Sequence, residues 1–207
     1  MTAQPAPAPA GRPADAEAQT LFDTATKLMA AGNIQEACKA FDASEKLTPT
    51  LNTLLNAAAC HDQNGELATA WGMFVEAERE TLGAADEESQ KMNALAAELA
   101  KRIEPRLSKL TIEVPDASRI GGLEIRRGAN VIEDGAWNVA LPVDGGVYTI
   151  SAQASGYERW TTTIVVAPEH DTKSVQVPPL SSRSRRAPMV PLVKGPPQLP
   201  SRSNLEV

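Results

Sequence analysis

The chain contains two cysteines, Cys38 and Cys60, and two histidines, His61 and His170. These residue types most often supply nucleophiles, general bases and transition-metal ligands. The sequence has no Gly-x-Ser-x-Gly elbow, no His-Glu-x-x-His motif and no phosphate-binding loop around which such residues could work. It therefore predicts a protein that is not an enzyme, with no catalytic residues and no cofactor.

The same four residues give no pattern typical of a metal site. Cys60 and His61 are consecutive, which places their side chains on different faces of a helix, and no further ligand cluster accompanies Cys38. We expect His61 to be a packed or rim residue, without a surrounding constellation of Ser, Cys or carboxylate groups. His170 is expected to lie in a hairpin turn over 168–171.

Helical periodicity covers the first half of the chain. Apolar residues recur at steps of three and four, and breaks fall at Gly32-Asn33, Pro49, Asn64-Gly65 and Pro105. Together these signals predict five helices, over 15–31, 34–47, 51–63, 66–82 and 86–104. The apolar stripe of the fifth helix is formed by Met92, Leu95, Leu99 and Ile103, and we expect this helix to cap the stack.

Landmark residues recur 33 positions apart in the first four helices. The matched pairs are Ala25 and Ala58, Gly32 and Gly65, Ala37 and Ala70, Phe41 and Phe74, and Ser44 and Ala77. This pattern resembles the tetratricopeptide repeat (TPR), a helical hairpin of about 34 residues in which small residues mark the close contacts. A closing proline, Pro49, is present only in the first unit. The resemblance implies a protein that binds other proteins.

The resemblance also implies positions for the cysteines and for a binding face. The second helix of one unit lies against the first helix of the next, so Cys38 and Cys60 would lie on adjoining helices, either as a disulfide or as two small buried hydrophobes. The hollow face of the repeat family is lined by the first helix of each unit. Here its partner-binding residues would be Phe22, Thr26, Met29, Leu55, Asn56, Ala59 and Asp62. The alternative is that the fifth helix or the second domain fills this groove.

After Pro105 the periodicity changes to two. Alternating or β-branched stretches at 110–114, 123–125, 147–152, 161–166 and 174–177, with weaker ones at 130–132 and 139–141, are separated by turn signals. They predict a small antiparallel β-sandwich. The stretch Pro142-Val-Asp-Gly-Gly-Val-Tyr148-Thr-Ile150, followed by Gly156-Tyr157, resembles PEGA-type domains of bacterial envelope proteins.

The composition of the chain indicates where its folded part ends and which classes of partner it excludes. Prolines gather near both termini, which predicts disordered segments at 1–16 and 179–207 around a TPR-like domain at 17–105 and a PEGA-like domain at 106–178. The net charge is −6 although the segment from Pro178 onward is basic, so the body is acidic, which argues against nucleic acid as a partner. No apolar run is long enough to span a bilayer, so membrane attachment is expected only if the natural chain continues into an anchor.

The whole layout, including the junction Glu104-Pro-Arg-Leu-Ser-Lys-Leu-Thr-Ile112, resembles predicted envelope proteins of myxobacteria. This resemblance implies a periplasmic or otherwise extracytoplasmic adaptor or scaffold that binds another envelope protein or a peptide. The alternative is a module that binds peptidoglycan or another glycan through aromatic residues of the β-domain. Tyr157 and Trp160 are its candidate residues, and Trp160 is the one we expect to be exposed; as the other possibility, these aromatics form core or cross-strand pairs.

Overall fold

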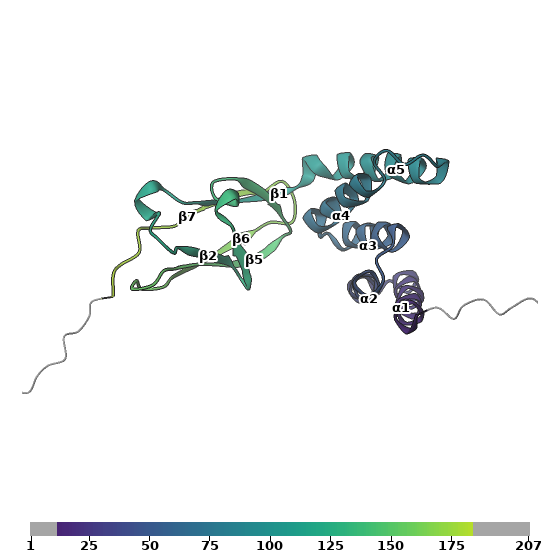
Figure 1. Ribbon diagram of the computed structural model, residues 1–207, viewed down its shortest axis with the longest axis horizontal. Coiled ribbons are helices and arrows are strands. Elements are labelled where there is room, and N and C mark those ends of the chain that lie inside the picture. The colour runs from purple at the N-terminus through teal and green to yellow at the C-terminus, as the bar shows by residue number, and fades with distance from the viewer. Residues whose placement is uncertain (1–11, 184–207) are drawn as a thin grey trace, which may run out of the picture.

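The computed structural model describes residues 12–183 (Figure 1). Within this range, five helices are followed by seven strands in two sheets, and the predicted α+β layout is confirmed. The helical and β-parts lie one after the other along the molecule and are joined where α5 leads into β1 (Figure 1). The predictions made for 1–11 and 184–207 lie outside the described residues.

The helices are α1 (Pro13–Ala30), α2 (Ile34–Leu47), α3 (Leu51–Asn64), α4 (Leu67–Glu80) and α5 (Glu87–Ile103). Local signals explain most of their ends. Pro13 occupies the first turn of α1, where its missing N–H costs nothing, so α1 begins inside the segment expected to be disordered. Thr50 and Asp86 accept hydrogen bonds from the first turns of α3 and α5, and Gly65 ends α3 with a φ of 80°.

The residues that recur at 33 positions are the packing residues of the two hairpins. Ala25, Ala58, Ala37 and Ala70 are fully buried, and Phe41 and Phe74 are each 1% exposed. Small side chains let the helix axes approach, and each phenylalanine fills the space beside them. The sequence spacing therefore reports a repeated packing arrangement.

The fifth helix packs against α4 with most of the predicted stripe, since Ile103 is buried and Leu99 packs against the same cluster. Ala96, Ala100 and Ile103 are buried, whereas Leu95 is 49% exposed. The prediction was wrong for Leu95, because it considered only the larger apolar residues and left out Ala96 and Ala100. The contact with α4 also uses these two alanines, which are spaced four apart and permit a close approach, and this leaves Leu95 outside.

The β-part contains β1 (Ser108–Glu113), β2 (Glu124–Arg127), β3 (Asn130–Ile132), β4 (Ala140–Val143), β5 (Gly146–Gln153), β6 (Trp160–Val166) and β7 (Thr172–Gln176). One sheet has the order β4-β1-β7 and the other β3-β2-β5-β6. Their facing residues form one core, which includes Ile112, Ile125, Ile150 and Val177.

Three details of the β-part differ from the expectation. The pair β1 and β7 is parallel, whereas the other pairs of the described strands are antiparallel. Since β6 and β7 belong to different sheets, the turn that carries His170 crosses between sheets and is not a hairpin. The ordered part also extends past 178, because Leu180 is nearly buried and Ser182 bridges to Tyr157.

Asp144 belongs to the β-part and caps α4 of the helical part, so it joins the two parts. It lies in the turn between β4 and β5, and its Oδ1 accepts hydrogen bonds from the backbone N–H groups of Ala68 at 2.7 Å and Thr69 at 3.2 Å. Its Oδ2 accepts from the Thr69 hydroxyl at 2.6 Å. Because α4 has no side-chain cap of its own, this carboxylate satisfies two of its free donors and faces the positive end of its dipole.

Arg106 makes a second link between the parts. It lies between α5 and β1, and its guanidinium forms a two-pronged ion pair with Glu169 in the β6–β7 connection at 2.6 and 3.0 Å. It also lies 3.7 Å from Asp62 of α3. Glu169 raises the pKa of the Arg106 guanidinium further above its ordinary value. The β-domain is thereby held against α3 and α4 at two points.

We expect Asp144→Ala to loosen this junction. Loss of a helix cap lowers the free energy of unfolding by about 1 kcal/mol, and here the cap also holds the domains together. Backbone ¹⁵N relaxation should give separate rotational correlation times for the two domains in the variant and one shared time in the wild type. Asp116→Ala, at an exposed position of the same domain, is the matched control. Identical relaxation in all three proteins would contradict the prediction.

Candidate functional site

Cys38 of α2 and Cys60 of α3 form a disulfide, with their Cα atoms 5.4 Å apart. Of the two alternatives left open by the sequence, the structure contains the bridge. Both residues are buried in the core of the first hairpin, together with Ala37, Phe41 and Ala57. The bridge therefore fastens the second helix of one hairpin to the first helix of the next.

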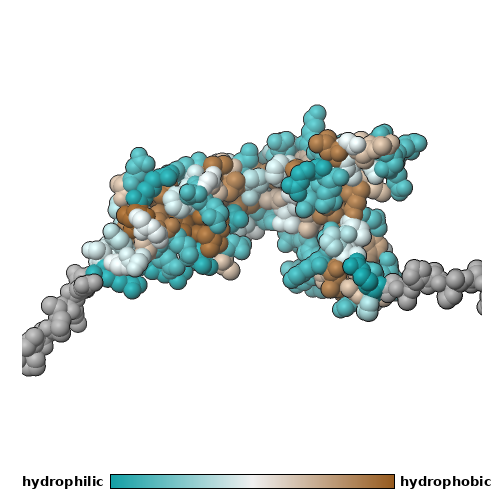
Figure 2. Space-filling model, in the orientation of Figure 1, coloured by the Kyte–Doolittle hydropathy of each residue, from teal (hydrophilic) through white to brown (hydrophobic). Residues whose placement is uncertain are grey.

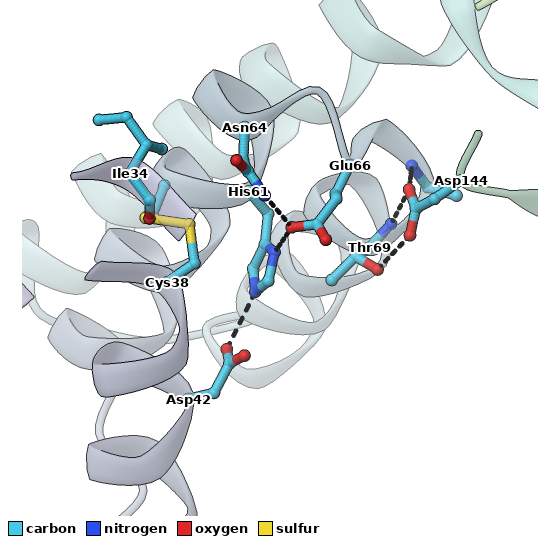
Figure 3. Close-up of polar contacts among 10 residues, drawn as sticks. Ile34, Cys38, Asp42, His61, Asn64, Glu66, Thr69 and Asp144 are labelled. Atoms are coloured by element: carbon cyan, nitrogen blue, oxygen red, sulfur yellow. Dashed lines mark hydrogen bonds and ion pairs between the residues drawn. A yellow bond between two sulfur atoms is a disulfide. The ribbon is translucent and has the colours of Figure 1, made fainter. Parts of the chain in front are cut away.

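His61 lies beside this disulfide between two carboxylates (Figure 3). Its Nδ1 is 2.6 Å from Glu66 Oε2, and its Nε2 is 3.0 Å from Asp42 Oδ1. Asn64 donates a hydrogen bond to the same Glu66 oxygen at 2.8 Å. We call Asp42, His61, Asn64 and Glu66 the His61 cluster. The left-handed turn at Gly65 returns the chain so that Glu66 faces the helix it has just left.

The carboxylates favour the charged form of His61. Burial lowers the pKa of His61, but hydrogen bonds and charge attraction from Asp42 and Glu66 outweigh burial and raise the pKa above its ordinary value of 6.5. When both ring nitrogens carry protons, each can donate to one carboxylate. The protonated ring can therefore link α3 to Asp42 of α2 and to Glu66 at the start of α4.

The His61 cluster makes stability depend on pH in a definite direction. Because folding raises the pKa of His61, protonated His61 stabilises the folded state. This contribution is present in full at pH values below about 6.5, the pKa of histidine in the unfolded chain, and it is lost as the pH rises through the pKa of His61 in the folded protein. We expect His61→Gln to lower the urea midpoint more in mildly acidic than in alkaline buffer. His170→Gln, in an exposed turn, is the control. An equal loss at every pH would contradict this prediction.

His61 is packed as predicted, at 7% exposed, but two other expectations about His61 and Cys38 are wrong. Carboxylates do surround His61, and a ligand cluster does accompany Cys38: one ligand atom each from Cys38, His61 and Glu66 lie within 4.8 Å of one another. The sequence argument considered neighbours along one helix, whereas these groups come from α2, α3 and the residue before α4. In the oxidised protein the Cys38 sulfur is bonded to Cys60, so it is not available as a thiolate ligand.

The predicted groove residues of α1 lie partly in the core. Phe22 and Met29 are half-buried and pack on the first hairpin, with Phe22 edge-on to Phe41 at 5.3 Å between ring centroids. Thr26 is exposed, and its hydroxyl donates to the carbonyl of Phe22. The helix α1 thus offers a largely polar face with apolar side chains set into it.

The predicted groove residues of α3 make more contacts within the protein than those of α1. Leu55 is half-buried against the clusters formed with α4 and α5, and Asn56 donates to the Asn52 carbonyl within α3. Asp62 is paired with Arg102 of α5 at 3.0 Å. Ala59 is exposed. The fifth helix therefore supplies an ionic partner at the end of this face, in line with the alternative that α5 partly fills the groove.

A small hollow opens where α1, the end of α2 and the start of α3 meet. It has a volume of about 230 Å³, and its lining includes Gln19, Phe22, Thr48 and Asn52. This is less than the roughly 300–1,000 Å³ of typical small-molecule pockets, so the hollow suits a single side chain of a partner better than a free ligand. On the face shown in Figure 2, apolar residues form small areas among hydrophilic ones over both parts of the molecule.

The candidate glycan-binding aromatics are not fully exposed. Tyr157 and Trp160 are half-buried and pack against the β-core, which differs from the expectation that Trp160 would be exposed. Tyr157 nevertheless lines an open hollow of about 460 Å³ together with Glu124, Gln153 and Arg159. Trp160 lines a separate hollow beside Pro178 and Pro179.

Sequence reasoning missed the residues that connect the domains. Asp144 was interpreted only as part of a turn, and Arg106 only as part of the junction sequence. Their partners lie 75 and 63 residues away in the chain, so no local pattern could have identified them.

No family model matches the chain, and a search of characterised proteins also finds no match. No helix within residues 12–183 is long and apolar enough to cross a membrane.

Proposed function

We propose that the protein is a non-enzymatic adaptor, built of TPR-like hairpins and a PEGA-like domain, that binds another protein or a peptide through the face formed by α1 and α3. The observation that carries this proposal is the repeated packing of the two hairpins, in which Ala25 and Ala58 bury equivalent positions. Stacked hairpins present their first helices side by side, which forms an extended surface suited to a peptide or helix.

The disulfide supports an extracytoplasmic location, because disulfides persist mainly in oxidising compartments. The contacts of Asp144 and Arg106 between the two parts support a scaffolding role. They fix the direction in which the β-domain projects from the helices, so a partner of one domain would be held at a defined orientation to a partner of the other.

The proposal is tested by adding charge to the α1–α3 face without disturbing the core. Thr26→Arg/Ala59→Arg changes two exposed residues of the first helices. Leu47→Arg/Val75→Arg makes an equal change at exposed residues of α2 and α4 and is the matched control. Affinity capture from a bacterial envelope extract, followed by mass spectrometry, should recover a defined protein with the wild type and the control. Recovery should fall at least about tenfold with the first variant, the loss produced by 1.4 kcal/mol of binding free energy.

Equal recovery with both variants would contradict binding through the α1–α3 face. Loss with the control alone would place the binding surface on α2 and α4. Circular dichroism of both variants establishes that the helices are intact.

A second candidate function is binding to peptidoglycan or another glycan. The observation in its favour is the hollow beside Tyr157, where an aromatic ring lies among a carboxylate, an amide and a guanidinium. If this function holds, the protein sediments with purified cell-wall sacculi, and Tyr157→Ala sediments less than Val165→Ala, an exposed change on β6. Sedimentation that is absent, or equal in both variants, argues against it.

A further inference from the structure

We propose that two copies of this chain associate through β6, whose free edge pairs antiparallel with β6 of the second copy. β6 is the last strand in the order β3-β2-β5-β6, so among the described strands only β5 is hydrogen-bonded to it. Pairing of the two β6 strands across a two-fold axis joins the sheets of the two copies into one continuous sheet. This dimer is independent of the partner proposed for the α1–α3 face.

β6 lacks the features that protect the other three sheet edges. Sheet edges are usually kept from pairing by short strands, by proline or by lysine. β3 has three residues, β4 contains Pro142 and β7 contains Lys173. β6, with the sequence Trp160-Thr-Thr-Thr-Ile-Val-Val166, has seven residues and neither a proline nor a charged side chain. Among the edges of the two described sheets, it is therefore the one best suited to add a strand.

The register of the sheet shows which backbone groups of β6 face its open edge. Gly128 donates its N–H to the carbonyl of Thr149, so the backbone polar groups of Thr149 face β2 and not β6. Thr149 lies opposite Thr163, and the two therefore form a non-hydrogen-bonded pair of the antiparallel ladder. The N–H and C=O groups of Thr163 thus point away from β5, and by the two-residue period of a strand so do those of Thr161 and Val165.

Contacts at both ends limit the open edge to these three residues. At one end, Trp160 lines a hollow with Pro178 and Pro179, which have no N–H to donate. At the other end, the N–H and C=O groups of Ala167 are both hydrogen-bonded to side chains of the β-part. Between these ends, the outward backbone groups have no hydrogen-bond partner within residues 12–183. A second strand would satisfy them without displacing an existing contact.

The outward residues of β6 suit a second copy of the same strand. With Thr163 on the two-fold axis, Thr163 pairs with its own copy and Thr161 pairs with Val165 of the second copy. Each of these pairs exchanges two backbone hydrogen bonds. A strand that pairs with itself places equal residues opposite one another, which is unfavourable when they are charged, and β6 carries no charge. Val165 is 64% exposed and loses part of this exposure against the Thr161 side chain of the second copy.

The interface is small, so the dimer is expected to be weak. Edge pairing of so few residues buries less than the roughly 1,200 Å² of a stable complex, and we expect a dissociation constant of roughly 10–100 μM. Sedimentation equilibrium of the full-length chain should show monomer at about 1 μM and mainly dimer at about 500 μM. A chain that remains monomeric at the higher concentration would overturn the proposal.

Amide hydrogen exchange at the two concentrations locates the contact. The N–H groups of Thr161, Thr163 and Val165 should exchange more slowly at the higher concentration, because pairing protects them. The N–H groups of Thr162 and Ile164 face β5 in both states and are the internal reference. A dimer in which exchange of the three outward amides does not change would contradict pairing through β6.

Charge at residue 163 separates self-pairing from other modes of association. Thr163→Lys and Thr163→Glu each place like charges opposite one another on the axis and should weaken the dimer at least about fivefold. An equimolar mixture of the two variants should dimerise more tightly than either alone, because lysine then faces glutamate. Thr163→Val keeps an uncharged β-branched side chain and is the matched control, with dimerisation expected to equal that of the wild type.

Thr163 is exposed, so all three variants should keep the wild-type circular dichroism. Unchanged dimerisation of both charged variants, or a mixture that is no tighter than its components, would overturn pairing about Thr163. A weak mixture cannot be attributed to unfolding when the spectra of both variants match that of the wild type.

Discussion

Phe74→Ala is expected to lower the free energy of unfolding by about 3–5 kcal/mol, the usual loss for a fully buried phenylalanine. Phe74 is 1% exposed and fills the space between α3, α4 and α5, beside Ala58, Ala70 and Ala100. Its neighbours include three alanines, whose side chains are too short to move into the cavity. The loss should therefore fall in the upper part of this range.

Urea unfolding followed by circular dichroism at the helical band measures this effect. Val75→Ala is the matched control, because Val75 is the next residue of α4 and is 36% exposed. We expect the control to stay within about 1 kcal/mol of the wild type, as exposed substitutions usually do. Similar losses in the two variants would mean that α4 does not pack through Phe74.

Loss of the disulfide should have the second largest effect. Cys38 and Cys60 are 22 residues apart, and in the loop-entropy description a bridge of this span stabilises the fold by roughly 3 kcal/mol. Cys38→Ala/Cys60→Ala removes the bridge while keeping small apolar side chains in the buried positions, so the expected loss is mainly that of the cross-link.

The measurement compares unfolding of four samples: wild type and double variant, each with and without tris(2-carboxyethyl)phosphine as the reductant, in metal-free buffer. Phosphine should lower the stability of the wild type to about that of the double variant and leave the double variant unchanged. A wild type that is insensitive to phosphine, although its thiols are shown to be reduced, would contradict the prediction.

Local patterns in the sequence were sufficient to predict the helices and strands. The positions of Pro49, Gly65 and Pro105 divided the first half of the chain into helices, because proline and glycine act on the backbone at their own position. The alternation of residues after Pro105 identified all seven strands, including the short β3 and β4. The spacing of Phe41 and Phe74 indicated a repeated packing.

How the helices and strands pack against one another was harder to predict from the sequence. For α5, the predicted stripe included Leu95, which is exposed, and left out Ala96 and Ala100, which are buried, because the burial of a small residue depends on how closely α4 approaches. The placement of Phe22 and Leu55 in the predicted groove likewise took no account of the core that half-buries them.

By itself, the sequence determined the helices and strands of this protein and the recurrence of packing residues in its two hairpins, and the resemblance to a helical repeat implied that the two cysteines lie on adjoining helices. Only the tertiary structure decided that His61 lies between Asp42 and Glu66 beside the disulfide, that Asp144 caps α4, and that β1 pairs in parallel with β7. The physical reason is the range of the interactions. Backbone propensity and periodicity act over a few residues, whereas these contacts join side chains and strands brought together only when whole helices and sheets pack.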